Sequence, residues 1–208
     1  MSKNMTIQQA KRIIRRKPLP KALAAGFAKN GWEHHLAAVY TRTAELFDDN
    51  ASASKALHTH LEQLLPCIAF YEVLQDVTGS KESALDFLDK WAFVEVEKLM
   101  PLARGVMKLG IYRMMPDLCG KMLDSMFGPE AGFESRPVPG APKFAVDMTR
   151  CPYVDTCRKY GCPELTRYAC KADDITYGNL HPKLVWARTQ TLGTGGECCD
   201  FRLHLKED

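Results

Sequence analysis

The spacing of apolar residues changes near residue 140, and this change limits the folds open to the chain. Before it, apolar side chains recur every three or four residues, which is typical of amphipathic helices. After it, apolar and polar residues alternate, as in residues 144–149, which is typical of strands with one buried face. The sequence therefore predicts an α+β fold, in which a helical N-terminal half packs on a small antiparallel sheet.

We expect a single domain of 208 residues, with a helical part at residues 1–130 and a mixed strand and helix part at residues 140–208. A stretch rich in Pro and Gly at residues 132–142 separates the two parts. Pro66 is expected to kink a helix and Pro101 to start a new one. Apolar stripes predict helices around residues 5–16, 22–47, 57–74, 85–99, 102–109 and 116–126.

The C-terminal part is predicted to place reactive residues at the ends of short elements. The strand at residues 144–149 ends next to Cys151, and a short helix at residues 164–174 presents Cys170. Two alternating segments, 184–192 and 199–205, flank a glycine-rich turn and predict an antiparallel hairpin. Arg188 would then face Asp200 or Arg202 across that hairpin.

The net charge and the hydropathy of the sequence limit the classes of partner that the chain is expected to bind. The net charge of +3 gives no electrostatic basis for binding nucleic acid. No run of 18 apolar residues is present, so neither a membrane-spanning helix nor a membrane partner is expected. The N-terminus lacks the apolar core of a secretory signal, which predicts a cytoplasmic protein whose thiols stay reduced. The oligomeric state is left open.

Six of the eight cysteines lie between residues 151 and 199, mixed with carboxylates and arginines. In a reducing compartment such cysteines are metal ligands, reactive thiols or buried small side chains. Their spacing lacks the Cys-x-x-Cys pairs typical of zinc sites, and the sequence requires no cofactor. A zinc centre built from Cys151, Cys170 and Cys199 would still leave one position open for a water molecule.

A second alternative is a thiolate nucleophile, activated by the charge of Arg188 or Arg202. Cys170 is the favoured thiol because Asp173 lies one helical turn away on the same face. Cys199 is favoured because it precedes Asp200 on a strand. Cys67 and Cys119 lie in apolar helical segments and are expected to serve packing alone.

The C-terminal motifs resemble a known family. Arg-Thr-Gln-Thr-Leu at residues 188–192, a glycine turn and Cys-Asp-Phe-Arg at residues 199–202 resemble the C-terminal motif of the L-2-amino-thiazoline-4-carboxylic acid hydrolase family. Cys-Pro-Tyr at residues 151–153 and Cys-x-x-Asp-Asp at residues 170–174 are also similar to that family's pattern. The resemblance thus covers the cysteine-rich segment.

The resemblance implies a hydrolase that opens a small cyclic isothiourea or amidine-like ring of the 2-amino-thiazoline-4-carboxylate type. Attack would fall on the ring carbon between nitrogen and sulfur, and a carbon–nitrogen or carbon–sulfur bond would break. A thiolate, whose conjugate acid has a pKa of about 8.5, leaves more easily than an unprotonated amine. Carbon–sulfur cleavage would yield an N-carbamoyl cysteine.

Such a reaction needs a cation for the substrate carboxylate, an anion for the amidinium, and a base or nucleophile. The predicted catalytic residues are Cys170, Cys199, Asp173 and Asp174, and the predicted substrate-binding residues are Arg188, Asp200 and Arg202. Arg188 and Asp200 would alternatively form a structural ion pair between strands. The competing function is a non-catalytic sensor module that binds zinc or a small ligand.

Overall fold

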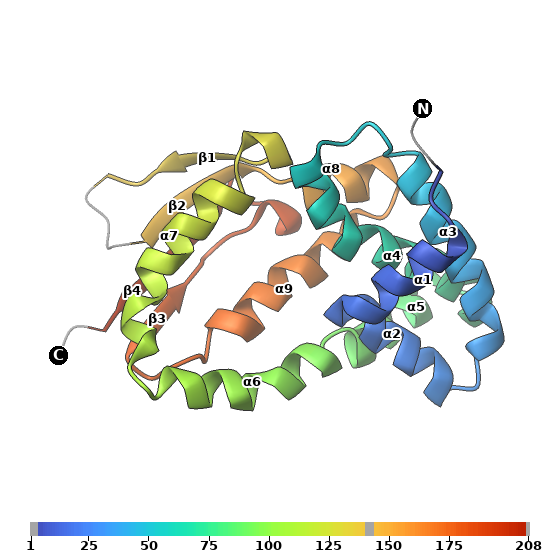
Figure 1. The fold of residues 1–208 in the computed structure, drawn as a ribbon, viewed down its shortest axis with the longest axis horizontal. Coiled ribbons are helices and arrows are strands. Elements are labelled where there is room, and N and C mark those ends of the chain that lie inside the picture. The colour runs from blue at the N-terminus through green and yellow to red at the C-terminus, as the bar shows by residue number, and fades with distance from the viewer. Residues whose placement is uncertain (1–3, 140–143, 207–208) are drawn as a thin grey trace. The chain divides into compact units, whose positions relative to one another are not determined.

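The computed structural model describes residues 4–139 and 144–206 and divides the chain into two compact units, Met1–Val96 and Glu97–Asp208. The predicted α+β class is confirmed, because helices are combined with one four-stranded antiparallel sheet among the described residues (Figure 1). The boundary between the units falls inside the helical part predicted for residues 1–130, and the single domain stays a prediction. Within the described ranges, no helix is long and apolar enough to cross a membrane.

The first unit is helical, and its helices begin where the sequence offers capping side chains. Thr6 forms a capping box with Gln9, while Ser54 and Ser80 accept hydrogen bonds from amides of the helices that follow them. Gly31, with φ of +73°, lies between the two α-helices that cover most of residues 22–47. The α-helices of the unit are α1 (Ile7–Arg16), α2 (Pro18–Lys29), α3 (Leu36–Asp48), α4 (Lys55–Thr78) and α5 (Lys81–Trp91).

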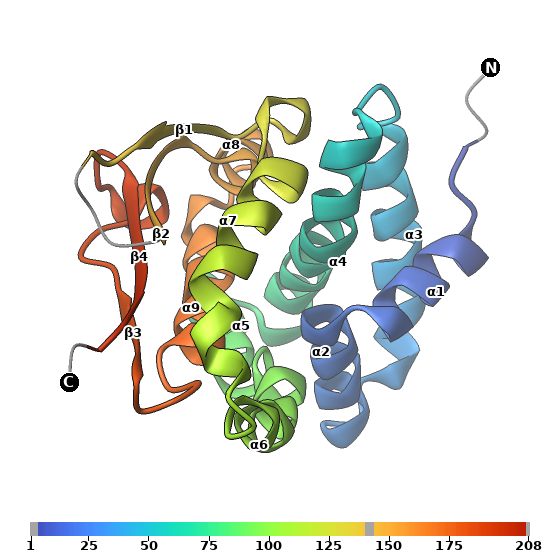
Figure 2. The ribbon, with the colours of Figure 1, turned by 60° about the vertical axis from the view of Figure 1, so that its left-hand side comes forward.

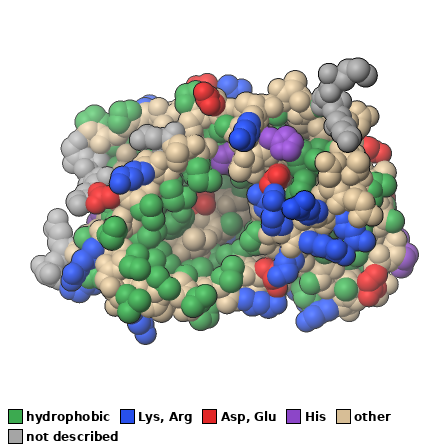
Figure 3. All heavy atoms as spheres, in the orientation of Figure 1, with side chains coloured by type: hydrophobic (Ala, Val, Ile, Leu, Met, Phe, Trp, Pro, Cys, Tyr) green, Lys and Arg blue, Asp and Glu red, His purple; other side chains and the backbone are tan. Residues whose placement is uncertain are grey.

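The next helix, α6 (Val94–Met107), runs through Pro101, so the prediction that Pro101 starts a new helix is wrong. Its apolar residues point in two directions: Met100 and Met107 are buried, whereas Leu99 and Leu102 are exposed. Hydrophobic side chains accordingly gather on the surface over α6 and α7 (Met115–Met126) (Figure 3). An apolar pattern on two faces obscures the helical period, which explains why the sequence suggested two separate segments.

The sheet has the strand order β1-β2-β4-β3, formed by β1 (Glu134–Pro137), β2 (Phe144–Arg150), β3 (Leu184–Ala187) and β4 (Cys199–Leu205). The predicted strand at residues 144–149 and the predicted hairpin are confirmed. However, β3 ends at Ala187 rather than at residue 192, because the carboxylate of Asp200 accepts hydrogen bonds from the backbone amides of Thr189 and Gln190. The edge strand β1 was not predicted; it lies in the stretch 132–142, of which residues 140–142 fall outside the described residues.

The two faces of the sheet differ in character, as the alternation of strand side chains requires. Phe201 and Leu203 lie on the inner face, which α7 and α9 (Thr166–Tyr177) cover from the same side (Figures 1 and 2). Arg202 lies on the outer face, where it donates a hydrogen bond of 2.8 Å to Asp147. The inner face therefore supplies the apolar core of the second unit, and the outer face carries ion pairs.

Candidate functional site

A pocket with an empty volume of about 510 Å³ lies on the inner face of the sheet, between α7, α9 and the strands. About 80 Å³ of this space is enclosed by the walls, and the rest opens to solvent. The enclosed part is smaller than the 300–1,000 Å³, roughly, that is usual for small-molecule sites, so a bound substrate would extend into the open part. The pocket is lined by Cys119, Met122, Leu123, Phe127, Phe144, Met148, Asp173, Tyr177, Trp186 and Phe201. Among these described residues Asp173 is the one that bears a formal charge, so the pocket is an apolar chamber with a single carboxyl group.

Helix α9 brings Asp173 to the pocket, with Cys170 and Tyr177 three and four residues away on the same side of the helix. Burial raises the pKa of Asp173 to about 7, against the opposing effect of Arg188 and with a further rise from Asp174. Although 43% of its side chain is accessible, that surface faces the pocket, whose apolar walls limit hydration. Asp173 is thus a carboxyl group that can both take up and release a proton near neutral pH.

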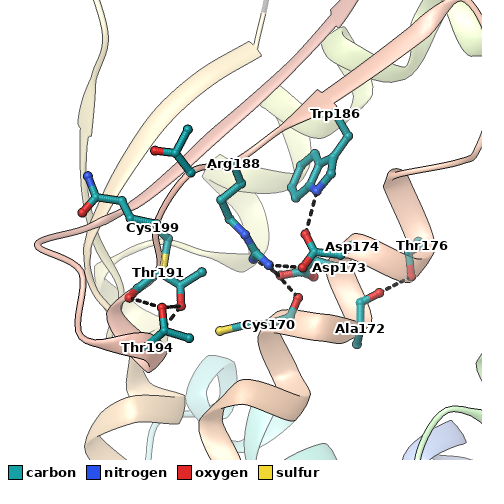
Figure 4. Close-up of polar contacts among 12 residues, drawn as sticks. Cys170, Ala172, Asp173, Asp174, Thr176, Trp186, Arg188, Thr191, Thr194 and Cys199 are labelled. Atoms are coloured by element: carbon teal, nitrogen blue, oxygen red, sulfur yellow. Dashed lines mark hydrogen bonds and ion pairs between the residues drawn. The ribbon is translucent and has the colours of Figure 1, made fainter.

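Arg188 follows β3 and reaches α9 with a side chain that is only 5% exposed (Figure 4). Its Nη2 donates hydrogen bonds to Asp174 Oδ2 at 2.6 Å and to the carbonyl oxygen of Cys170 at 3.0 Å. Its Nη1 lies 3.6 Å from Asp173 Oδ2 and has no hydrogen-bond partner. Trp186 Nε1 donates to the other oxygen of Asp174 at 3.0 Å. Asp174 therefore fixes Arg188, whereas Asp173 remains directed to the pocket.

Tyr177 and Cys119 form a second polar contact in the pocket wall. Burial raises the pKa of Tyr177 to about 12, supported by the nearby charges of Cys119 and Asp173 and by a hydrogen bond with Cys119. Burial also raises the pKa of the Cys119 thiol, although its hydrogen bond with Tyr177 acts in the opposite direction. Sequence reasoning assigned Cys119 to packing and did not select Tyr177 or Trp186. The alternation of β3, which puts Trp186 on the same face as Arg188, was the available signal.

Cys151, Cys170 and Cys199 come from three elements and lie near one another. Cys151 is the N-cap residue of α8 (Pro152–Lys159), and the amide of Leu192 donates to Cys199 Sγ at 3.2 Å. Burial raises the pKa of Cys151 to about 12 and that of Cys199 to about 11. Burial also raises the pKa of Cys170, although a hydrogen bond with Thr191 and the charge of Arg188 lower it. At neutral pH these thiols are therefore protonated.

The turn after Thr191 packs tightly against α9 beside Cys170 (Figure 4). A Cβ atom at Gly193 would lie 2.7 Å from Thr166 Cγ2 and 3.1 Å from Cys170 Sγ. Because such distances are too short for a side chain, this position requires glycine. The glycine in the C-terminal motif thus allows the turn to approach Cys170 closely.

The described residues contain no group of three or more His, Cys, Asp or Glu side chains arranged to hold a metal ion. The predicted zinc centre of Cys151, Cys170 and Cys199 is thus without support from the geometry and stays a prediction. The same three thiols remain close enough to raise the pKa of one another. The three residues therefore form a thiol cluster, in which Cys199 is buried and Cys151 and Cys170 are half-buried.

Asp200 and Arg202, predicted to bind substrate, have other contacts. The carboxylate of Asp200 accepts hydrogen bonds from the amides of Thr189 and Gln190, both at 2.9 Å, and from the Thr189 hydroxyl at 2.6 Å. Burial alone would raise the pKa of Asp200, but these hydrogen bonds lower it below its ordinary value. Arg202 pairs with Asp147 on the outer face, opposite the pocket. The predicted substrate-binding roles of both residues remain predictions, and Arg188 pairs with Asp173 and Asp174 rather than across the hairpin.

The chain was compared with curated proteins, solved structures and the sequence profiles of protein families. No curated protein and no solved structure matches it. Residues 58–203, well over half of the chain, match the sequence profile of a family described as L-2-amino-thiazoline-4-carboxylic acid hydrolase. The matched region includes the pocket, the thiol cluster and the C-terminal motifs in which the resemblance was first seen. The chain therefore belongs to the L-2-amino-thiazoline-4-carboxylic acid hydrolase family.

Proposed function

We propose that this protein is a hydrolase that opens a cyclic isothiourea of the 2-amino-thiazoline-4-carboxylate type in the pocket beside Asp173. The observation that carries the proposal is the pKa of about 7 of Asp173, a carboxyl group directed into an otherwise apolar pocket. General acid–base catalysis is most effective when the pKa of the catalytic group is near the working pH. Membership of a family named for this hydrolysis supports the choice of reaction.

In the proposed reaction, the Asp173 carboxylate removes a proton from water as the oxygen adds to the ring carbon between nitrogen and sulfur. The tetrahedral intermediate formed from the amidinium then breaks its carbon–sulfur bond while its hydroxyl group releases a proton to solvent, and the departing sulfur takes the proton from Asp173. One water molecule is consumed, the carboxylate is regenerated, and the product is N-carbamoyl cysteine. Sulfur leaves in preference to nitrogen because a thiolate is the weaker base.

Arg188 is proposed to attract the substrate carboxylate and to hold Asp173 in place. Its Nη1 atom is buried beside Asp173 without a hydrogen-bond partner, so the guanidinium would act on the substrate carboxylate through its positive charge. Asp174 is proposed to be a positioning residue, since it binds both Arg188 and Trp186 and so fixes the guanidinium.

The raised pKa values of Cys170 and Cys199 favour Asp173 over a resting thiolate as the group that starts the reaction. At pH 7 a thiol whose pKa is about 11 is almost entirely protonated. In the proposed mechanism Cys170 and Cys199 are therefore neutral thiols that pack near Arg188 and do not attack the substrate. A thiolate mechanism would need substrate binding to lower their pKa by several units.

The proposal is tested by incubating the purified protein with 2-amino-thiazoline-4-carboxylate and following the gain of one water by mass spectrometry. The wild type should form N-carbamoyl cysteine, and Asp173→Asn should reduce turnover by about 10²- to 10⁴-fold, the usual contribution of a general acid–base group. Asp155→Asn, which alters a half-exposed carboxylate on α8, is the matched control and should behave as wild type.

Circular dichroism would establish that both variants are folded. Wild-type turnover by Asp173→Asn would contradict the assignment of Asp173. Binding of cyclic isothioureas without conversion of any of them would instead favour the non-catalytic sensor.

A further inference from the structure

The pocket has one polar end and one apolar end. Asp173 and Tyr177 lie on α9, next to Trp186 of β3, and make the polar end. The apolar end lies where α7 covers β2, between Phe127 and the inner face of that strand. Its floor extends along β2 from Phe144 to Met148, which at about 3.4 Å per residue is about 13 Å. This floor is longer than one five-membered ring with a carboxylate, and most of the space above it is open to solvent, with about 80 Å³ enclosed.

The apolar end offers little to a small, highly polar substrate. Met122 and Leu123 of α7 face the same space as Phe127, and none of the three has a side-chain donor or a carboxylate. A thiazoline carboxylate bound at Asp173 would leave these side chains in contact with water. An apolar group on the ring would cover them and gain roughly 25 cal/mol for each Å² of apolar surface removed from water.

Aromatic rings connect the two ends of the pocket. Tyr177 stacks on Trp186 with ring centroids 5.0 Å apart, and Trp186 lies 5.5 Å from Phe201. Such a wall suits a flat, positively charged group, because aromatic faces attract cations and pack well against planar groups. The guanidinium of Arg188 already uses part of it, with Cζ 5.9 Å from the Trp186 centroid and 5.5 Å from the Phe201 centroid. The amidinium of a cyclic isothiourea has both properties, and Asp173 supplies the opposite charge.

We propose that the substrate is a 2-amino-thiazoline that carries a bulky apolar substituent, with its amidinium at Asp173 and the substituent between Phe127, Phe144 and Met148. The inference rests on the proposed function and adds the class of substrate. Methionine side chains adapt to the shape of a bound group, so Met122 and Met148 make this end tolerant of aryl and branched alkyl groups alike.

The test compares 2-amino-thiazoline-4-carboxylate with the same compound bearing a phenyl group on ring carbon 5. Hydrolysis is followed by mass spectrometry, and binding is measured separately by calorimetry. The phenyl compound should have a kcat/KM about 10- to 100-fold higher, as expected for burying one aromatic ring.

Leu123→Trp fills the apolar end and should bring the ratio of the two kcat/KM values close to one. Leu118→Trp changes an exposed residue on the same helix, outside the pocket, and should leave the ratio as in wild type. If Leu123→Trp does not fold, Met122→Phe makes a smaller change at the same end, and it should also lower the ratio.

Each outcome separates the inference from the proposed function. Equal or faster hydrolysis of the unsubstituted compound would overturn the inference and leave the hydrolase proposal standing. Tighter binding of the phenyl compound, with no hydrolysis of either compound, would support a preference of the pocket for apolar substituents and would overturn the hydrolase proposal. Absence of both binding and hydrolysis would overturn the two together.

Discussion

Arg188 Nη1 lies 3.6 Å from Asp173 Oδ2 and donates no hydrogen bond to it. A direct hydrogen bond would stabilise the carboxylate and lower its pKa, as happens for Asp147 beside Arg202. The longer distance leaves burial as the dominant influence on Asp173. The guanidinium therefore lowers the pKa of Asp173 only in part, and the carboxyl group keeps a pKa of about 7.

The first prediction concerns the pH dependence of catalysis. Because Asp173 must be deprotonated to accept a proton from water, kcat/KM should rise with pH, pass its midpoint near pH 7 and then level off. The measurement is the rate of ring opening between pH 5.5 and 8.5. Asp155→Asn should keep this profile. A rate that is constant across the range would show that Asp173 isn't the group that titrates.

The second prediction concerns stability, which depends on pH through the same carboxyl group. The pKa of Asp173 is about 7 in the folded chain and about 3.9 when unfolded, so between these values only the folded state keeps the proton. Its contribution to stability is therefore lost as pH rises from about 4 to about 7. Asp173→Asn should become more stable relative to wild type between pH 5 and pH 8. Urea unfolding at both pH values checks this, and an unchanged difference would contradict it.

The third prediction compares two arginines with different surroundings. Arg188→Met removes hydrogen bonds to Asp174 and to the Cys170 carbonyl from a side chain that is 5% exposed. The free energy of unfolding should fall by about 1.5–3 kcal/mol, the usual cost of losing a hydrogen bond to a charged group. Arg150→Met, at an exposed ion pair with Asp155, should leave the melting temperature nearly unchanged. Equal losses in the two variants would show that burial of Arg188 has no energetic consequence.

The fourth prediction separates the carboxylate mechanism from the thiol mechanism favoured by the sequence. With the pKa values of Cys170 and Cys199 raised by burial, alkylation by iodoacetamide should be slow at pH 7 and faster above pH 9. Cys170→Ser and Cys199→Ser should keep turnover within about tenfold of wild type, since neither removes the acid–base group. Loss of turnover in both folded variants, with Cys67→Ser active, would restore the thiol-centred mechanism.

The spacing of apolar residues predicted the helices and strands that bury one face. It missed those whose position depends on packing against distant parts of the chain. The strand Phe144–Arg150 was found from alternation because one face is buried, which fixes the register of its side chains. The edge strand Glu134–Pro137 is exposed at every residue and contains proline, so it carries no such signal. For α6, tertiary packing on one side and exposed leucines on the other mask the helical period.

The residues of the candidate site were also predicted only in part. Asp173 and Arg188 came from the C-terminal motifs, and the structure brings them together. Alternation separates Phe201 from Arg202, but it does not say which face of the sheet meets the helices, so the sequence alone could not place Arg202 on the outer face. Tyr177 and Cys119 come together only when α7 and α9 pack on one sheet, and no spacing in the sequence encodes that approach.

The alternation of β2 and β4 has a consequence for how this protein can diversify. Residues that shape the pocket, such as Phe144 and Phe201, alternate with residues that hold the outer face, such as Asp147 and Arg202. Substitutions on the inner face can therefore change which molecules fit while the outer ion pairs continue to keep the strands in register. One short sheet thus provides an inner face that can vary and an outer face that stays constant, which makes it a practical scaffold for redesigning the selectivity of the pocket.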